Sequence, residues 1–131
     1  MIVADASALL EYLLGTDAAP FIAGSVRAPD ADLHVPALCD IEVGSGLRRA
    51  MLGKELSESR AIEALDDYLD LPLSRHGHRS LLGRVLELRA NFSAYDATYV
   101  ALAEQLGADL LTADSRLIRS VRTHTLVAVR S

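Results

Sequence analysis

Apolar residues along the chain form two kinds of pattern, which alternate from one end to the other. Short uninterrupted apolar runs are typical of buried strands, and stretches in which apolar residues recur every three or four positions are typical of helices. Strands are predicted over residues 2–4, 33–35, 71–74, 109–112 and 125–129. Helices are predicted over residues 6–14, 18–26, 37–52, 58–70, 80–90, 94–106 and 114–120.

Local signals mark the ends of several of these elements. Gly15 and Gly107 each follow an apolar helical segment, where glycine is typical of a helix C-terminus. Ser57 and Ser93 precede helical segments and are good N-caps. Pro72 favours an edge position for its strand, because a proline has no N–H for a second neighbour.

Two of the predicted helices carry the most informative apolar patterns. The helix over 37–52 has a broad apolar stripe of Leu38, Ile41, Val43, Leu47 and Ala50. The helix over 58–70 repeats Ala61, Ile62, Leu65 and Leu69 at helical spacing. Gly44 and Gly46 lower the helix propensity of the first by about 1 kcal/mol each relative to Ala, and we interpret them as allowing close packing.

Alternating strands and helices predict a mainly parallel sheet, since consecutive parallel strands need a crossover connection. The 131 residues are enough for one compact domain and too few for two ordinary ones. We therefore expect residues 1–131 to form a single domain, a three-layer α/β/α sandwich with about five strands.

Composition indicates where in the cell this domain is expected. Half of the residues are hydrophobic, so a substantial core can form. No apolar run approaches the roughly 18 residues of a membrane span, and the N-terminus lacks the pattern of a signal peptide. The single Cys39 cannot form an internal disulfide. We expect a cytoplasmic protein that does not enter the membrane.

The net charge of −5 has the wrong sign for binding nucleic acid by bulk electrostatics. The charges are unevenly distributed: residues 1–47 hold seven acids and one base, and residues 115–131 hold four arginines and no acid. Arg predominates over Lys, which favours phosphate contacts, although an Arg- and Ala-rich composition also follows from a GC-rich genome.

Four acids are predicted to meet at one edge of the sheet. Asp5 follows the first strand and Asp114 the strand over 109–112, so both lie at the carboxyl edge, where α/β proteins bind ligands. Asp96 lies in the first turn of a helix that starts at this edge. Glu42 lies seven residues past Val35, about 10 Å along the next helix at 1.5 Å per residue.

Each acid also has an ordinary explanation. Asp5 and Asp114 could be helix N-caps, Asp96 could form a capping box with Ser93, and Glu42 could be a solvated helix residue. Together, however, several carboxylates at one edge repel each other unless a cation neutralises them. Oxygen ligands suit hard divalent ions such as Mg²⁺ or Mn²⁺, so the cluster indicates a metal site.

The segments around these acids resemble the PIN-domain ribonucleases, and most closely the VapC-type toxins of bacterial toxin–antitoxin pairs. The segments are Val3-Ala4-Asp5-Ala6-Ser7-Ala8, Pro36 to Glu42, Tyr95-Asp96-Ala97 and Leu111-Thr112-Ala113-Asp114. The resemblance implies a metal-dependent endoribonuclease that leaves 5′-phosphate and 3′-hydroxyl ends, with Mg²⁺ or Mn²⁺ as cofactor. It also implies a VapB-type antitoxin partner and a homodimer.

Within this resemblance, Asp5, Glu42, Asp96 and Asp114 match the acidic quartet of the family, with Asp5 and Asp96 as the firmest metal ligands. Ser7 and Thr112 are candidates to orient carboxylates or waters, and hydrogen bonding to the backbone of the turn explains them equally well. Arg48, Arg49 and Arg116 are candidates to contact RNA, although charged residues on a helix are more often a solvated face.

Other residues and other classes of protein remain open alternatives. His76 and His78 suggest a metal pair but have no third ligand near them in sequence, and Asp109 begins its strand and should lie at the opposite edge. A receiver-like phosphoacceptor domain would need a late lysine, whereas Lys54 lies in the first half. A haloacid-type phosphotransferase would need an acid where Ser7 stands. An inactive PIN-like interaction module is the third alternative.

Overall fold

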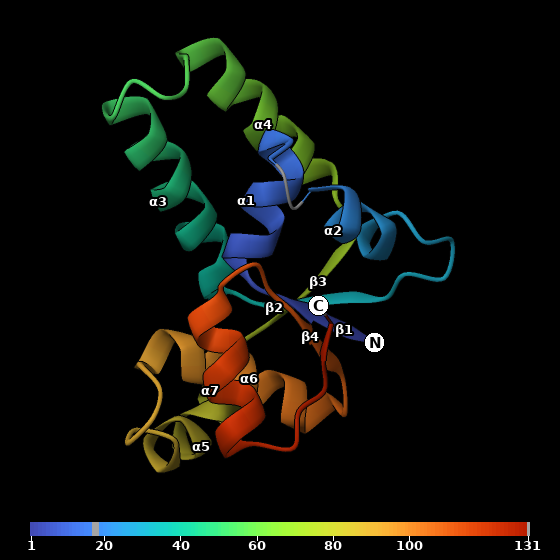
Figure 1. Ribbon diagram of the computed structural model, residues 1–131, viewed down its shortest axis with the longest axis vertical. Helices are drawn as coiled ribbons and strands as arrows, with labels where there is room; N and C mark the ends of the chain where they lie inside the picture. Colours follow the sequence, from blue (N-terminus) through green and yellow to red (C-terminus); the bar gives the residue numbers. More distant parts are fainter. Residues whose placement is uncertain (17–18, 131) are drawn as a thin grey trace.

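A computed structural model describes residues 1–16 and 19–130 of the chain. Its centre is a five-stranded sheet with the strand order β3-β2-β1-β4-β5 (Figure 1). The strands are β1 Ile2–Ala4, β2 Leu33–Pro36, β3 Leu73–His76, β4 Asp109–Leu111 and β5 Val129–Arg130. All four pairings in this order are parallel, and β3 lies at an edge, which confirms the predicted arrangement.

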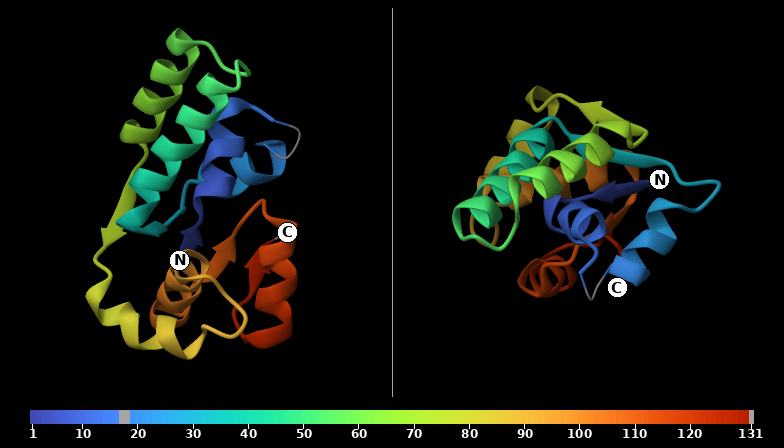
Figure 2. Two further views of the ribbon diagram at one scale, coloured as in Figure 1. Left: turned by 90° about the vertical axis from the view of Figure 1, so that its left-hand side faces the viewer. Right: turned by 90° about the horizontal axis from the view of Figure 1, so that it is seen from above.

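Helices cover the two faces of this sheet. The first four helices lie on one side of it in Figure 1, and α5, α6 and α7 lie on the other; Figure 2 shows the same layers from two further sides. The helices are α1 Ala6–Leu14, α2 Ala19–Val26, α3 Leu38–Leu52, α4 Glu58–Asp70, α5 Leu82–Glu87, α6 Ala94–Leu106 and α7 Ser115–His124. The expected three-layer α/β/α sandwich is therefore confirmed.

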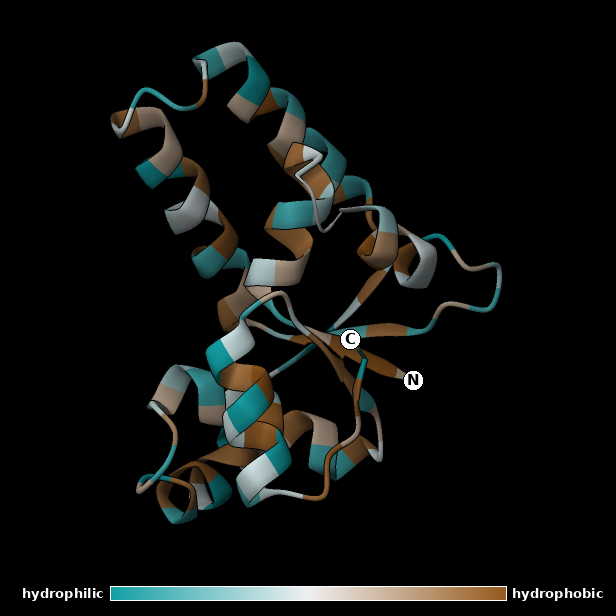
Figure 3. Cartoon of the chain, in the orientation of Figure 1, coloured by the Kyte–Doolittle hydropathy of each residue, from teal (hydrophilic) through white to brown (hydrophobic). Residues whose placement is uncertain are grey.

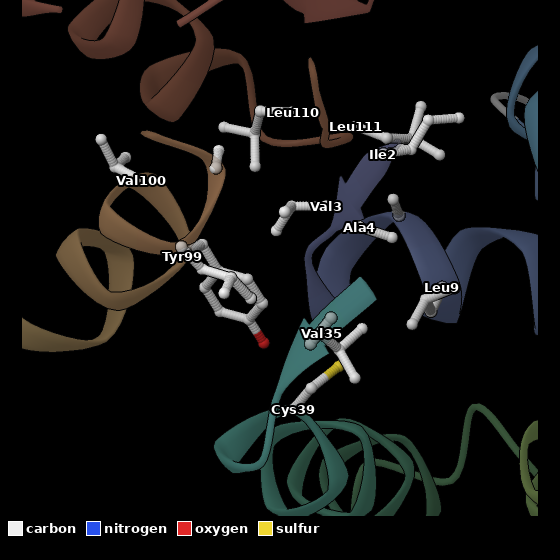
Figure 4. Packing of buried hydrophobic residues seen from close by; sticks show 14 of the residues in the cluster. Ile2, Val3, Ala4, Leu9, Val35, Cys39, Tyr99, Val100, Leu110 and Leu111 are labelled. Carbon is white, nitrogen blue, oxygen red and sulfur yellow. The ribbon is translucent and has the colours of Figure 1, made fainter. Parts of the chain in front are cut away.

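The core lies on both faces of β1, the middle strand. Val3 and Ala4 are fully buried, as expected for a central strand that helices cover on both sides. Figure 4 shows Leu9 of α1 on one side of this strand and Val100 of α6 on the other. Burying side chains of this size contributes roughly 1.5–3 kcal/mol each, so β1 and the residue that follows it, Asp5, are held firmly.

The predicted helix ends are confirmed by their capping geometry. The Ser57 hydroxyl accepts a hydrogen bond from the Arg60 amide at 3.2 Å, which caps α4. Gly15 ends α1 with φ 65° and Gly107 ends α6 with φ 63°. Glycine is favoured at both positions because a side chain with a Cβ is strained in this left-handed conformation. The predicted start of α2 at Ala18 lies outside the described residues.

The predictions differ from the structure mainly after residue 70. The strand predicted over 71–74 is β3, Leu73–His76, which begins after Pro72. The helix predicted over 80–90 is a 3₁₀ turn, Arg79–Leu81, followed by the short α5. Helix α7 was predicted to end at residue 120 but continues to His124, so the strand predicted over 125–129 shrinks to Val129–Arg130. Basic residues in the last turn of α7 suit its C-terminus, and residues 125–128 serve as the connection back to the sheet.

Several apolar residues that marked helices face solvent. Figure 3 shows hydrophobic and hydrophilic residues intermixed along α3 and α4. Ile41 of α3 is 76% exposed, whereas Val43 and Leu47 of the predicted stripe are buried, together with Cys39. On α4 the buried residues are Ala61, Ala64 and Tyr68, whereas the apolar residues Ile62, Leu65 and Leu69 are 52%, 40% and 62% exposed. Small residues face the core here because α4 packs closely on α1 and α3.

Gly46 and Gly44 differ in the role that the structure gives them. A Cβ on Gly46 would collide with the terminal methyl groups of Leu10 on α1, so this glycine lets α1 and α3 approach closely. Around Gly44 there is open space. The predicted close packing is therefore confirmed for one of the two glycines. Within the described residues, no helix has both the length and the apolar character needed to cross a membrane.

Candidate active site

The topology of the sheet points to the gap between β1 and β4. The chain leaves β1 toward β2 on one side and leaves β4 toward β5 on the other, so the strand order reverses between them. In open α/β sheets ligands bind outside the carboxyl ends of the strands at such a switch point. Asp5 immediately follows β1, and Asp114 follows β4 after two residues.

A cavity of about 250 Å³ opens at this point. All four predicted acids line it, although they come from four separate segments of the chain. The remaining walls come from α1, α3 and α6. The full lining is Asp5, Ala6, Ser7, Leu10, Glu42, Arg49, Asp96, Tyr99 and Asp114.

Asp5 is the most constrained of the four acids. One carboxylate oxygen, Oδ1, accepts hydrogen bonds from the Ser7 hydroxyl at 2.7 Å and the Ala8 amide at 2.9 Å. The other, Oδ2, accepts one from the Thr112 hydroxyl at 2.6 Å. Burial nevertheless raises the pKa of Asp5 to about 6, with a further contribution from the charge of Asp114. Burial outweighs the hydrogen bonds because Asp5 is only 6% exposed to solvent.

Ser7 and Thr112 connect the ends of the two central strands. Besides donating to Asp5, the Ser7 hydroxyl accepts from the Ala113 amide at 3.1 Å, and the Thr112 hydroxyl accepts from the Asp114 amide at 3.0 Å. The two roles weighed for these hydroxyls, orienting a carboxylate and bonding to the turn backbone, therefore occur together. As a result the position of Asp5 is coupled to that of Asp114.

Asp96 and Asp114 lie at the starts of α6 and α7. Burial, together with the charge of Asp114, raises the pKa of Asp96, and Ser93 and Arg116 oppose this rise. Asp114 caps α7: its Oδ1 accepts from the Arg116 amide at 2.9 Å and from the Leu117 amide at 3.3 Å. Capping by Asp114 was one of the ordinary explanations, and it is correct, but it engages only one of the two carboxylate oxygens.

Glu42 is held by a residue that the sequence did not single out. The Tyr99 hydroxyl donates a hydrogen bond of 2.6 Å to Glu42 Oε1. Burial is the largest cause that raises the pKa of Tyr99 above its ordinary range, so the phenol keeps its proton and acts as a donor. Tyr99 follows Asp96 by three positions and so lies on the same face of α6. This spacing could have identified it.

The predicted arginines lie at different places around the acids. Arg49 lines the acidic cavity, seven residues beyond Glu42 on α3 and about 10 Å further along its axis. Arg48 is exposed and does not line this cavity. Arg116 lines an adjoining cavity that shares Asp96 and Asp114 with the first.

The other acids and histidines considered from the sequence lie elsewhere. Asp109 begins β4 and pairs with Arg130 at 3.1 Å, at the opposite end of the strand, as predicted. His76 hydrogen-bonds to the ring of His34 at 2.9 Å, and His34 in turn bonds to Asp32 at 2.9 Å. His78 accepts from the Leu38 amide at 3.0 Å. These side chains are engaged in joining β2, β3 and α3.

The donor set at the cavity fits a hard divalent cation. All four groups are carboxylates, which are the ligands that Mg²⁺ and Mn²⁺ prefer. The charge of Asp114 raises the pKa of both Asp5 and Asp96, and a cation between them would relieve this repulsion. In the described part of the chain no three Asp, Glu, His or Cys side chains are already arranged around one metal position. The four acids therefore fit a divalent cation in the type of their ligand atoms and in their location around one cavity.

Comparison with known proteins gives consistent results over most of the chain. The model of the PIN domain family matches residues 2–122. Ribonuclease VapC9 of Mycobacterium tuberculosis is 45% identical over 117 residues, which cover 89% of this chain and 88% of that protein. Ribonuclease VapC12 of the same organism is 37% identical over 120 residues, which cover 92% of each.

Solved structures show the same fold at low sequence identity. VapC20 of Mycobacterium tuberculosis, described as a sarcin-ricin loop cleaving toxin, superposes with a TM-score of 0.71 at 15% identity and covers 92% of this chain and 95% of its own. VapBC2 of Rickettsia felis, bound to a DNA fragment from its promoter, has a TM-score of 0.70 at 14% identity, with coverage of 99% and 98%.

Proposed function

The chain belongs to the PIN-domain family, among the VapC ribonucleases, and we therefore propose that it is a metal-dependent endoribonuclease, the toxin of a toxin–antitoxin pair. One observation carries the proposal beyond family membership. Four carboxylates from four separate segments line a single cavity at the switch point of the sheet. The relatives at 37–45% identity are named as ribonucleases, which agrees with this chemistry.

We propose that Asp5 and Asp96 are the firmest ligands of Mg²⁺ or Mn²⁺, and that Glu42 and Asp114 complete the site directly or through water. A bound ion would polarise the phosphodiester, lower the pKa of a bound water and, with a second ion, stabilise the leaving oxygen. The separation of these acids in sequence and their convergence in space support this assignment. Hydrogen bonds from Ser7 and Thr112 hold the Asp5 carboxylate in place for the ion.

The reaction we propose is in-line hydrolysis. The oxygen of a water molecule forms a bond to phosphorus, and the bond from phosphorus to the 3′ oxygen breaks. The water gives up a proton, the departing 3′ oxygen takes one, and a 5′-phosphate remains on the other product. Tyr99 keeps the Glu42 carboxylate directed into the cavity. On one side of the acids Arg49 offers a contact to a neighbouring phosphate, and on the other side Arg116 does so.

We also propose a VapB-type antitoxin and a second copy of the chain as partners. The solved structures with this fold include a toxin–antitoxin complex from Klebsiella pneumoniae. Exposed apolar side chains on α3 and α4, among them Ile41, Leu52, Ile62 and Leu69, supply surface that a protein partner could cover.

The direct test is cleavage of end-labelled RNA by the purified chain freed of any antitoxin. Cutting is expected with Mg²⁺ or Mn²⁺ and not with EDTA, and the products should carry 5′-phosphate and 3′-hydroxyl ends. Removal and re-addition of metal should switch the activity off and on. Cutting that persists in EDTA, or that leaves cyclic phosphate ends, would contradict the metal-dependent hydrolysis.

Arg49→Ala is expected to weaken substrate binding more than catalysis. Losing one phosphate contact should raise KM roughly five- to tenfold, change kcat less than about threefold, and lower the slope of log KM against log salt by about 1. The matched comparison is Arg48→Ala, which removes the same charge one residue earlier, outside the cavity. Steady-state kinetics at several salt concentrations measure both. Equal effects of the two substitutions would contradict this prediction and show that Arg49 acts only through its positive charge, without a specific phosphate contact.

A further inference from the structure

A second cavity of about 200 Å³ adjoins the acidic one. It lies between the start of α6, the residues that precede it and the first turns of α7. Asp96 and Asp114 line both cavities, so the two form neighbouring compartments of one surface. Pockets for drug-sized ligands measure roughly 300–1,000 Å³. This compartment is smaller and suits a single unit of a longer substrate.

The lining of the second cavity combines apolar and polar side chains. Phe92 and Leu117 are buried and supply the apolar part of the lining. Asn91, Ser93, Arg116 and Ser120 supply polar groups beside the two acids. Among the described residues, no hydrogen bond engages the side-chain amide of Asn91 or the Ser120 hydroxyl, and no carboxylate forms an ion pair with Arg116; only the backbone N–H of Asn91 is engaged, by the Leu88 carbonyl at 3.2 Å. These groups are therefore available to a ligand.

The two compartments differ in what they can recognise. Beyond Glu42, the acidic cavity is lined by Leu10 of α1 and Arg49 of α3, and a guanidinium beside an apolar side chain suits a phosphate and its sugar. On the α7 side, the Asn91 amide offers both donors and an acceptor, and the Ser120 hydroxyl offers one of each. Proteins read single-stranded RNA through such groups on the edges of bases that are turned out of the stack.

We propose that the second cavity is a base-reading subsite for the nucleotide next to the scissile phosphodiester. Asn91 and Ser120 bind the edge of the base, and Arg116 holds the adjoining phosphate. This inference rests on the proposed ribonuclease function and adds to it specificity-determining residues and the class of ligand, an unpaired RNA base. Because the compartment shares Asp96 and Asp114 with the acidic cavity, a base bound in it places its own phosphate over the carboxylates.

Selection at this subsite follows from the cost of unpaired polar groups. A base whose edge matches the Asn91 amide replaces the water that hydrates it, whereas a mismatched base leaves the amide without a partner in a partly closed space. Hydrogen-bonded recognition of one base changes binding roughly 5- to 150-fold. We therefore expect a marked preference at one nucleotide position adjoining the cut.

The experiment compares base preference in the native chain and in Asn91→Ala and Ser120→Ala. Each protein cuts an RNA pool that is randomised around the cleavage site, and sequencing of the 5′-phosphate products gives the preference at each position. Both substitutions are expected to flatten the preference at the same single position, Asn91→Ala by about tenfold, and to leave the other positions unchanged. The matched control is Gln105→Ala, which removes an amide that lines a different cavity on α6.

A second readout separates the subsite from the proposed activity. Asp5→Asn protein, with and without Asn91→Ala, selects RNA from the same pool by binding alone. Loss of selectivity at one position in the double variant supports the subsite even where no cutting occurs, and the absence of cutting by the native chain would count against the ribonuclease proposal only. Unchanged preference in both readouts, or a change equal to that of Gln105→Ala, overturns the inference.

Discussion

Asp5→Asn is expected to abolish RNA cleavage, with a loss of about 10³-fold or more in rate, while the fold stays intact. A factor of 10³ corresponds to about 4 kcal/mol of transition-state stabilisation. The substitution keeps the shape and most of the hydrogen bonds: an amide oxygen can still accept from Ser7 and the Ala8 amide. It removes only the negative charge that the proposed cation needs. Initial rates on a labelled RNA, with circular dichroism for the fold, measure both parts.

Asp109→Asn is the matched control for this loss. It removes a carboxylate of the same strand pair, but at the opposite end of β4, where Asp109 pairs with Arg130 on the surface. Exposed ion pairs contribute little to stability, typically about 0–1 kcal/mol. Activity of this variant is expected to stay within about twofold of the native value. An Asp5→Asn protein that keeps more than a tenth of the activity would show that the centre is misassigned.

The order of elements could be predicted from sequence because local signals and burial agree over most of the chain. The N-cap of Ser57 and the left-handed Gly15 and Gly107 are decided within a few residues, and the structure has each of them as predicted. The predicted end of α7 was wrong: Val121 lies four residues after Leu117, is fully buried and continues the helix, and only the three residues after it are polar. The position of this helix end depends on the connection from α7 back to β5, which is a tertiary contact and not a local signal.

The exposed apolar residues mark a different limit of sequence patterns. Ile62, Leu65 and Leu69 repeat at helical spacing, and this correctly indicated a helix. The same spacing does not say which side of α4 faces the core, because Ala61, Ala64 and Tyr68 repeat with the same period one position earlier. Close approach to neighbouring helices favoured the stripe with small residues. The larger apolar stripe was left for solvent or for a partner.

The candidate site was predictable where it depended on topology. Residues that follow parallel strands or begin helices must lie at one edge, so Asp5, Asp96 and Asp114 could be grouped from their places in the pattern. The link between Tyr99 and Glu42 joins residues 57 positions apart, and the pairing of His34 with His76 joins residues 42 apart. Such contacts depend on side-chain directions across elements, which no local pattern encodes.

The ionised carboxylate of Asp5, which the proposed cleavage needs, destabilises the folded chain. Its pKa is raised from the ordinary 3.8 to about 6, chiefly by burial. Between these two values the folded state binds a proton that the unfolded state has released, so stability falls as pH rises through this window. A difference of this size between the two pKa values lowers the free energy of unfolding by about 3 kcal/mol. This destabilisation is present in full above pH 6 and absent below about pH 4.

Asp5→Asn is therefore expected to be more stable than the native chain at pH 7 without metal, by about 3 kcal/mol or about 10 °C in Tm. This difference in stability between the two proteins should appear between about pH 4 and pH 6 and stay constant above pH 6, because the amide of the variant does not titrate. Thermal or urea unfolding in EDTA across this range measures it. Mg²⁺ at pH 7 should reduce this difference, since a cation bound by the folded native chain stabilises only that chain. A stability difference that does not change with pH would contradict this prediction. It would mean that ionising Asp5 costs the folded state nothing, so that no repulsion remains for a cation to relieve.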